Sequence, residues 1–408
     1  MSNIKVIDSI MGAGKTSWAI QYMNEHPEQN FLYITPTLDE VNRIISAGLQ
    51  GETPRRFYQP KHLGKGKLNS LNYLLASEND IACTHALFKL IDAESLQRIQ
   101  EGEYTLIIDE AVDVFHLEKM SKKDNMRLIQ QSGFCSIDEN DYVIWNEDEA
   151  NAETDFDDLK RLSLRHSLMK IDDKNLIWKY PPDIFKSGVD IFVLTYLFES
   201  STMSIYFNME NIGYEKKSIN HDINGYSLVD YSPADTAPFR QLIHIYEGPL
   251  NKLTMKKRDL SIGWYKNSIN KATVKKLKLN LDNYYRHIVD TSSKDFMWTC
   301  YKAQQSKLYG KARETSFVSC NARSTNEYIH KSNLAYMVNM QFNPSEWTFY
   351  KKHNLKVNKD LWALSSMLQW IWRSQIRNGK PINIYIPSYR MRMLLYDWLN
   401  MKLPKLKT

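Results

Sequence analysis

The sequence predicts an α/β protein with two domains, each built on a doubly wound parallel sheet. Short apolar runs of strand length alternate with stretches of helical periodicity, and this alternation occurs twice along the chain. The chain has 408 residues, 43% of them hydrophobic, which is enough for two domains of about 100–200 residues, each with a core. We expect residues 1–205 and 241–408 to form these domains.

The first sixteen residues predict a phosphate-binding loop. An apolar strand over 5–10 leads into Met11-Gly12-Ala13-Gly14-Lys15-Thr16, and a helix follows. In such a loop the backbone N–H groups of Gly12, Ala13 and Gly14 surround a phosphate. Lys15 reaches the β- and γ-phosphates of ATP, and the Thr16 hydroxyl holds Mg²⁺. Ser9 stands where the strict pattern has glycine, and a plain glycine-rich turn with a solvated lysine is the alternative.

A pair of carboxylates follows the apolar strand over 105–108. Asp109 is placed at the strand end to hold Mg²⁺, and Glu110 is placed to orient and deprotonate an attacking water. In isolation the pair is also compatible with a helix N-cap. Together with the phosphate loop it favours a site for ATP hydrolysis.

Other strands of the first domain are expected over 31–35, 80–84 and 190–195, and they end on Thr35, Thr84 and Thr195. Ligands of parallel sheets bind at the carboxyl ends of the strands. We therefore expect these threonines to lie at the same edge as the phosphate loop and the carboxylate pair.

Two stretches interrupt the alternation. Acidic clusters between about 133 and 182 indicate an insertion at the edge of the first sheet, to which no chemistry is assigned. Residues 206–240 lack a clear period and contain Gly213, Gly225 and Pro233. We expect this second stretch to connect the two domains.

The second domain repeats the α/β pattern with a lysine-rich helix over 270–279. Its strands are expected over 242–246, 295–300, 316–320, 334–338 and 382–386. Before the last strand, Gln369, Arg373 and Arg377 follow an i, i+4, i+8 spacing that predicts one helix face. Arginines aimed across a cleft stabilise charge on a transferring phosphoryl group. A solvated arginine face is the alternative.

The charge is distributed unevenly. Residues 1–200 carry 21 Lys and Arg against 32 Asp and Glu, a net charge of −11, and residues 201–408 carry 32 against 15, a net charge of +17. A basic second half favours a polyanionic partner, although solvated surface lysine gives the same count. Aromatic residues interleaved with basic ones, as in 264–266 and 284–286, favour nucleic acid because bases stack on such rings.

The remaining composition favours a cytoplasmic protein. The chain has no apolar run near the roughly 18 residues of a membrane span and no signal-peptide pattern at its start. Its four cysteines are far apart and form no Cys-x-x-Cys pair, which favours reduced thiols. If the protein is phage-encoded, its compartment is the host cytoplasm.

The motif order resembles that of superfamily 2 helicases of the DEAD/DEAH type. The likeness is greatest to bacteriophage-encoded replication helicases and more distant to herpesvirus origin-binding helicases. It spans Ile10 to Arg392. The segments that carry it are Ser9–Thr16, Ile34–Thr37, Cys83–Phe88, Ile107–Ala111, Val193–Thr195, Asn321–Tyr328 and Gln369–Arg373.

This resemblance implies two RecA-like domains with ATP and Mg²⁺ in the cleft between them and single-stranded nucleic acid running across both. It implies that Gln369 senses the γ-phosphate and that Arg373 is the arginine finger. Thr35, Thr84 and Thr195, with Arg323 and Asn326, would contact the strand or couple it to hydrolysis. The chain departs from the family in having Trp372 where glycine is usual and Arg377 four residues after Arg373 instead of three. Which arginine is the finger stays open.

We expect a nucleic-acid-dependent ATPase, most concretely a phage DNA helicase or translocase acting in replication or recombination. The expected partners are single-stranded or forked DNA, with RNA not excluded, and phage replication proteins; the protein would be a monomer or weak oligomer. The alternatives are a terminase-like packaging ATPase, a small-molecule phosphotransferase, and a nucleotide-binding clamp or anti-host factor.

Overall fold

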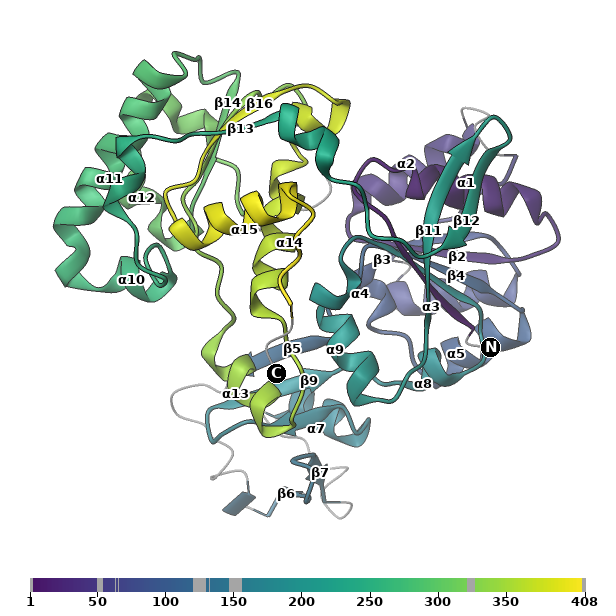
Figure 1. Cartoon of the computed structure of the whole chain (residues 1–408). Helices are drawn as coiled ribbons and strands as arrows, with labels where there is room; N and C mark the ends of the chain where they lie inside the picture. The colour runs from purple at the N-terminus through teal and green to yellow at the C-terminus, as the bar shows by residue number, and fades with distance from the viewer. Residues whose placement is uncertain are drawn as a thin grey trace.

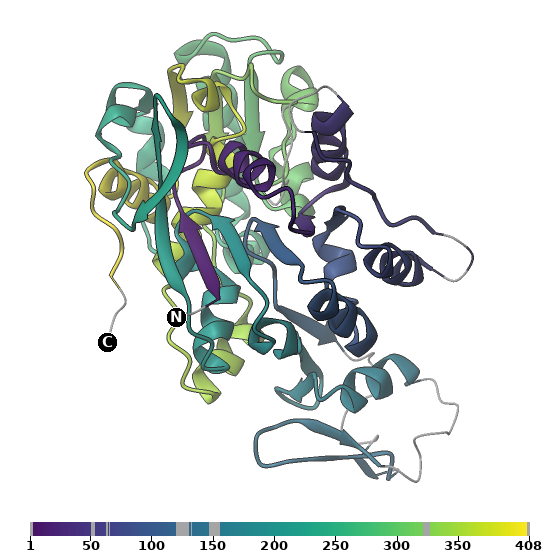
Figure 2. The same cartoon turned by 90° about the vertical axis from the view of Figure 1, so that its right-hand side faces the viewer.

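The computed structural model contains two α/β domains that face each other and a smaller mixed region beside them (Figure 1, Figure 2). The small region lies at the bottom of Figure 1, below both domains. The residues that the structure describes are 3–49, 54–62, 64, 66–119, 130–131, 133–146, 156–320 and 327–405.

The first domain is built on a seven-stranded sheet of order β12-β11-β1-β10-β4-β2-β3. All the strands expected in this domain are present and parallel to one another. They are β1 (Ile4–Asp8), β2 (Phe31–Thr35), β3 (Ile81–Thr84), β4 (Thr105–Asp109) and β10 (Ile191–Thr195).

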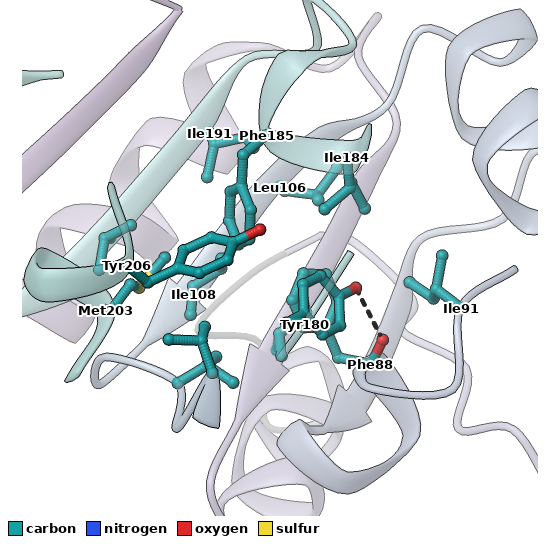
Figure 3. Close-up of a cluster of buried hydrophobic side chains, with 14 of the residues drawn as sticks. Phe88, Ile91, Leu106, Ile108, Tyr180, Ile184, Phe185, Ile191, Met203 and Tyr206 are labelled. Atoms are coloured by element: carbon teal, nitrogen blue, oxygen red, sulfur yellow. Dashed lines mark hydrogen bonds between the residues drawn. The ribbon is translucent and has the colours of Figure 1, made fainter. Parts of the chain in front are cut away.

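Helices cover both faces of this sheet, because successive strand residues point to opposite sides. Leu106 and Ile108 of β4 join the core on one face, and Ile107 joins the core on the other. Figure 3 shows the first of these cores, where the Tyr180 hydroxyl donates to the Phe88 carbonyl at 3.1 Å. The helices are α1 (Lys15–Glu25), α2 (Leu38–Leu49), α3 (Lys67–Ala76), α4 (His85–Phe88), α5 (Ala93–Glu101), α8 (Asp183–Lys186), η2 (Phe198–Ser200) and α9 (Thr202–Met209).

Residues 206–240, where the domain connection is expected, also contribute two strands to the first sheet. This segment contains the end of α9 and a hairpin of β11 (Glu215–Asp222) and β12 (Gly225–Asp230), and β11 pairs with β1 in parallel. The hairpin turns at Asn224-Gly225, a dipeptide that favours tight hairpin turns. Both strands carry many polar residues, and β12 is the edge strand of the sheet.

The insertion lies between β4 and β10 and begins earlier than expected. It forms a three-stranded antiparallel sheet of order β5-β9-β8 and a separate two-stranded hairpin of β6 and β7. Phe115 of this region packs its ring against Phe349 and Tyr350 of the second domain. Its elements are β5 (Phe115–Lys119), β6 (Cys135–Ile137), β7 (Val143–Trp145), α7 (Asp157–Leu164), β8 (Leu168–Lys170) and β9 (Asn175–Lys179).

The second domain has a four-stranded parallel sheet of order β13-β16-β15-β14. Its strands are β13 (Ile243–Ile245), β14 (Phe296–Thr299), β15 (Asn333–Tyr336) and β16 (Ile382–Tyr385). The strand expected over 316–320 is not formed: Phe317 makes a single bridge with Trp298, and the backbone before it is a 3-10 turn.

Helices flank this second sheet as well. The longer ones are α11 (Lys271–Asn283), α13 (Pro344–Lys352), α14 (Lys359–Ile371) and α15 (Tyr389–Leu399). The short helices and turns are η3 (Ala237–Gln241), η4 (Pro249–Leu253), α10 (Ile262–Lys266), η5 (Ser268–Asn270), η6 (Tyr284–Ile288), η7 (Lys302–Gln304), α12 (Gln305–Leu308), η8 (Lys311–Ser316) and η9 (Gln375–Asn378). Among the described residues, every helix is too short or too polar to cross a bilayer.

Candidate active site

A hollow of about 300 Å³ lies where the two domains meet. Residues of both domains line it, and most of those singled out from the sequence are among them. The first domain contributes Gly12, Gly14, Lys15, Thr16, Asp109, Glu110 and Thr195, and the second contributes Gln369, Arg373 and Arg377.

The phosphate loop connects β1 directly to α1. Gly12 and Gly14 have φ values of 86° and 87°, in the left-handed region that glycine adopts without strain. The Ala13 N–H donates to the Ile10 carbonyl at 3.1 Å, which closes the turn. Helix α1 begins at Lys15, so its unpaired N-terminal N–H groups point toward the hollow, as an anion site requires.

Lys15 is held at the base of this loop. Its Nζ donates to the carbonyls of Ser9 and Ile10 at 2.6 and 3.0 Å. Desolvation of the ammonium group lowers its pKa to about 8, against the opposing attraction of Asp109. A phosphate in the hollow would offset this desolvation, so the lysine is suited to an anionic ligand.

Asp109 is placed at the end of β4 by contacts on both sides. The Tyr33 hydroxyl donates to Asp109 Oδ2 at 3.2 Å. The Nε2 atom of His85 lies 2.8 Å from the backbone carbonyl oxygen of Asp109, within hydrogen-bond distance. Burial, followed by repulsion from Glu110, raises the pKa of Asp109 to about 7. A buried carboxylate of this kind favours a cation beside it.

Glu110 lies in a sharp change of chain direction. Its φ is 62°, which is uncommon for a residue with a side chain, and its N–H donates to the Leu194 carbonyl at 2.9 Å. Such backbone conformations gather at functional sites, where the surrounding structure fixes them. Here the sheet fixes the turn that places Glu110 in the hollow.

The second-domain residues do not share one helix, contrary to the expectation from their spacing. Helix α14 ends at Ile371, Ser374 is extended, and η9 carries Arg377. Both arginines nevertheless reach the hollow, Arg373 as a buried residue and Arg377 as an exposed one. The positive charge of Arg377 is among the groups that lower the pKa of Lys15.

Trp372 connects the second domain to the phosphate loop. Its Nε1 donates to the Met11 carbonyl at 3.1 Å, and its ring meets Phe239 and Trp398 edge-on. A glycine at this position would provide neither contact. The tryptophan therefore makes a direct link between the arginine segment and the loop.

Three other expected site residues, Ala13, Thr35 and Thr84, do not line the hollow. Ala13 forms the loop backbone without lining the cavity, and Thr35 is buried. Thr84 caps α4 by accepting from the Leu87 N–H at 3.4 Å. Arg323 and Asn326 lie outside the described residues.

The sequence reasoning missed Asp8, a buried residue at the end of β1. Its carboxylate accepts from the N–H groups of Leu197 and Phe198 at 2.7 and 3.1 Å and pairs with Lys216 Nζ at 3.3 Å. It thereby fixes the loop after β10, where Tyr196 lines the hollow. An acidic residue at the end of an apolar strand was the available signal.

The donor set fits Mg²⁺ and a nucleotide. Thr16 and Asp109 bring a hydroxyl and a carboxylate to the same hollow, and oxygen ligands of this kind are those that Mg²⁺ prefers. Lysine, arginines and helix N–H groups at the same hollow suit phosphates.

Family models match two parts of the chain. Residues 237–399 match the YonV C-terminal Rossmann-like domain, and residues 117–178 match the YonV middle domain. The second match coincides with the inserted region. The chain is also 41% identical over 414 residues to the "SPbeta prophage-derived uncharacterized protein YonV" of Bacillus subtilis (strain 168), covering 98% of this chain and 99% of that protein.

Among solved structures, S. tokodaii Xpd4 is similar with a TM-score of 0.52 at 13% identity, covering 97% of this chain and 94% of that chain. The DUF1998 helicase MrfA bound to DNA and AMPPNP covers 99% of this chain and 49% of that chain at 9% identity, but its TM-score of 0.34 is too low to carry an argument.

These likenesses agree with the expected fold of two RecA-like domains. The finer likeness to phage replication helicases and herpesvirus origin-binding helicases stays a prediction. Identity and coverage with the prophage-derived relative establish the family relationship over the whole length of both chains. The chain belongs to the YonV family.

Proposed function

We propose that this protein is a nucleic-acid-dependent ATPase, most concretely a phage DNA helicase or translocase. One observation carries the proposal: a phosphate loop and an Asp-Glu pair from one domain share a hollow with a glutamine and two arginines from the other. A site divided between two domains gives hydrolysis a mechanical consequence, because closing the site moves one domain against the other.

Each residue has a proposed role in hydrolysis. Lys15 and the loop N–H groups bind the β- and γ-phosphates, and Glu110 orients the attacking water and accepts its proton. Mg²⁺, held by Thr16 and Asp109, would offset charge on the phosphates. Gln369 contacts the γ-phosphate side, and Arg373 or Arg377 stabilises the charge that develops in the transition state.

The basic second domain supports a nucleic-acid track. Its exposed cations include Lys275 and Lys276 of α11. We expect strand affinity to fall steeply between about 50 and 200 mM salt, because lysine and arginine contacts release counterions from the phosphates. Fluorescence anisotropy of a labelled single strand measures this slope, and a salt-insensitive affinity would contradict a phosphate-tracking interface.

Steady-state ATP hydrolysis tests the proposal. It is measured without nucleic acid and with single-stranded DNA, single-stranded RNA or duplex DNA, and Lys15→Ala serves as the blank. Stimulation by one polymer that disappears in Lys15→Ala supports a motor and identifies its track. ATP turnover that none of the polymers changes would favour a packaging-type motor or a small-molecule enzyme. The absence of ATP turnover would favour a nucleotide-binding clamp.

The prophage origin of the relative supports a phage setting. Within that setting we propose phage replication proteins as partners. Strand displacement on a forked substrate distinguishes unwinding from translocation alone. A protein that hydrolyses ATP on single-stranded DNA but separates no fork would be a translocase.

A further inference from the structure

The β11–β12 hairpin lies against the phosphate loop and α1. In Figure 1 the two strands run beside α1 at the edge of the first sheet. Strand β11 pairs with β1, the strand that leads into the loop, with Lys5 opposite Glu215 and Ile7 opposite Lys217. The roles proposed above give this hairpin no task, although it borders the proposed ATP site.

Side-chain hydrogen bonds attach the hairpin to the site at two places. Ser9, which replaces the first glycine of the loop pattern, accepts the N–H of Ile219 on its Oγ at 3.0 Å. Gln21 of α1 accepts the N–H of Tyr226 on Oε1 at 2.8 Å and donates from Nε2 to the Tyr226 carbonyl at 3.1 Å. The backbone of Tyr226 is therefore fixed relative to α1.

The ring of Tyr226 lies directly on the phosphate loop. A Cβ added to Gly14 would stand 2.3 Å from Tyr226 Cε1, so the ring occupies the space beside this glycine. His221 stacks on Tyr226 with ring centroids 4.2 Å apart and an interplanar angle of 18°. Both contacts hold the aromatic ring in one orientation. Because His221 covers one face of the ring, a base can stack only on the opposite face.

Tyr226 also borders a second, open hollow of about 420 Å³ along α1, and the other residues that line it are Ser17, Ile20, Gln21, Asn24 and Glu25. Ser17 lines both this hollow and the one that holds the phosphate loop. The two spaces thus adjoin at the residue directly after Thr16. A nucleotide whose phosphates occupy the loop can extend its base past Ser17 toward the ring.

Resting on the function proposed above, we propose that Tyr226 is the stacking platform for the nucleotide base and that the β11–β12 hairpin is the base-binding element of this ATPase. A ring face attracts any purine, since every base has a π face. The Gln21 amide is already engaged by the Tyr226 backbone through both its oxygen and its nitrogen. Gln21 Nε2 also donates to Glu25 Oε1 at 2.8 Å, so this amide nitrogen has no further N–H with which to read the edge of the base.

The test is calorimetric titration of the full chain, in the presence of Mg²⁺, with AMPPNP, GMPPNP and inorganic tripolyphosphate. Tripolyphosphate has no base, so it reports on the phosphate loop alone. The variant is Tyr226→Ala. The controls are Tyr226→Phe, which keeps the ring, and Val229→Ala, an exposed residue of the same hairpin. Thermal melting of every variant verifies that it is folded.

We expect Tyr226→Ala to weaken both analogues roughly tenfold and to leave tripolyphosphate affinity within about twofold, with both controls close to wild type. An unchanged AMPPNP affinity would overturn the base-platform role. An equal loss for tripolyphosphate would also overturn it, because the ring would then act on the loop. Wild-type protein that binds none of the three ligands would overturn the proposed function itself.

Discussion

The two sides of the shared hollow are built in different ways. On the first-domain side, Lys15 and Asp109 are held by backbone carbonyls, a tyrosine and the ends of parallel strands. On the second-domain side, the arginines lie in the segment after the C-terminal end of α14. Trp372 of this segment donates a hydrogen bond to the phosphate loop. The first side is set by the fold of one domain, whereas the second depends on how the domains meet.

This difference suggests a division of labour. Residues fixed within one domain are suited to bind nucleotide in any arrangement of the domains. Residues that arrive across the interface are suited to act only when the domains are closed, which is how hydrolysis becomes coupled to movement. Substitutions on the two sides should therefore separate binding from turnover.

The largest effect is expected from the arginines. Arg377→Ala and Arg373→Ala should each lower kcat. The loss should be roughly 10³-fold or more for whichever residue is the arginine finger, because the charge on the transferring phosphoryl group then loses its partner. Arg373 is buried and Arg377 is exposed, so only Arg373→Ala should also lower the melting temperature appreciably. Hydrolysis assays and thermal melting measure both quantities.

Lys380→Ala is the matched control for the arginines, since it removes an exposed cation three residues after Arg377 that does not line the hollow. Nucleotide affinity should stay near wild type in Arg377→Ala. If both arginine variants hydrolysed ATP at the wild-type rate, the second-domain side would have no part in the chemistry.

Glu110→Gln should keep nucleotide binding and lose turnover by roughly 10²-fold or more, because the amide cannot accept the proton of the attacking water. Titration with ATP and single-turnover hydrolysis separate the two properties. Loss of binding without loss of turnover at saturating ATP would place Glu110 in a binding role instead.

Asp109 gives nucleotide binding a pH dependence of defined sign. Because burial raises its pKa to about 7, the carboxyl is mostly protonated below about pH 6 and must lose its proton to bind Mg²⁺. Lys15 has the opposite effect on proton exchange. Its pKa is lowered to about 8, so above that pH the lysine is mostly neutral and takes up a proton when phosphate binds.

Titration of Mg²⁺ and AMPPNP in buffers of different ionisation enthalpy measures this exchange. At pH 6 we expect the wild type to release about one proton more per nucleotide than Asp109→Asn, because any proton lost by the terminal phosphate is common to both proteins. Equal release from both proteins would assign the proton to another group.

The smallest effect is expected from Trp372→Phe. It keeps an aromatic ring but removes the hydrogen bond to the Met11 carbonyl, worth about 0.5–1.5 kcal/mol. Strand-stimulated kcat/KM should fall about two- to tenfold if this bond favours domain closure. Trp264→Phe in α10, away from the interface, is the control, and an equal loss in both would point to general destabilisation.

The parts of the molecule set by short-range order could be predicted from the sequence. Strand, glycine loop and helix follow one another within residues 4–25, and the structure places the loop where that order requires. Asp109 and Glu110 come directly after an apolar strand in the same way. The fold class is confirmed, while the chemical roles of these residues stay predictions.

The missed features depend on contacts between distant segments. A continuous i, i+4 pattern cannot show that α14 ends at Ile371, because Ser374 becomes extended where the segment meets the rest of its domain. The β11–β12 hairpin has polar strands without an apolar alternation. Its one local signal, Asn224-Gly225, predicts a turn but not the pairing with β1 that brings Tyr226 to the loop.

ATP turnover on single-stranded DNA, measured side by side in the wild type, Lys15→Ala, Arg373→Ala and Arg377→Ala, tests the composite site most directly. The wild type should be stimulated by the strand. Every variant should lower this turnover, with nucleotide affinity lost only in Lys15→Ala. Wild-type turnover in Arg377→Ala together with Arg373→Ala, or in Lys15→Ala alone, would contradict a site completed by both domains.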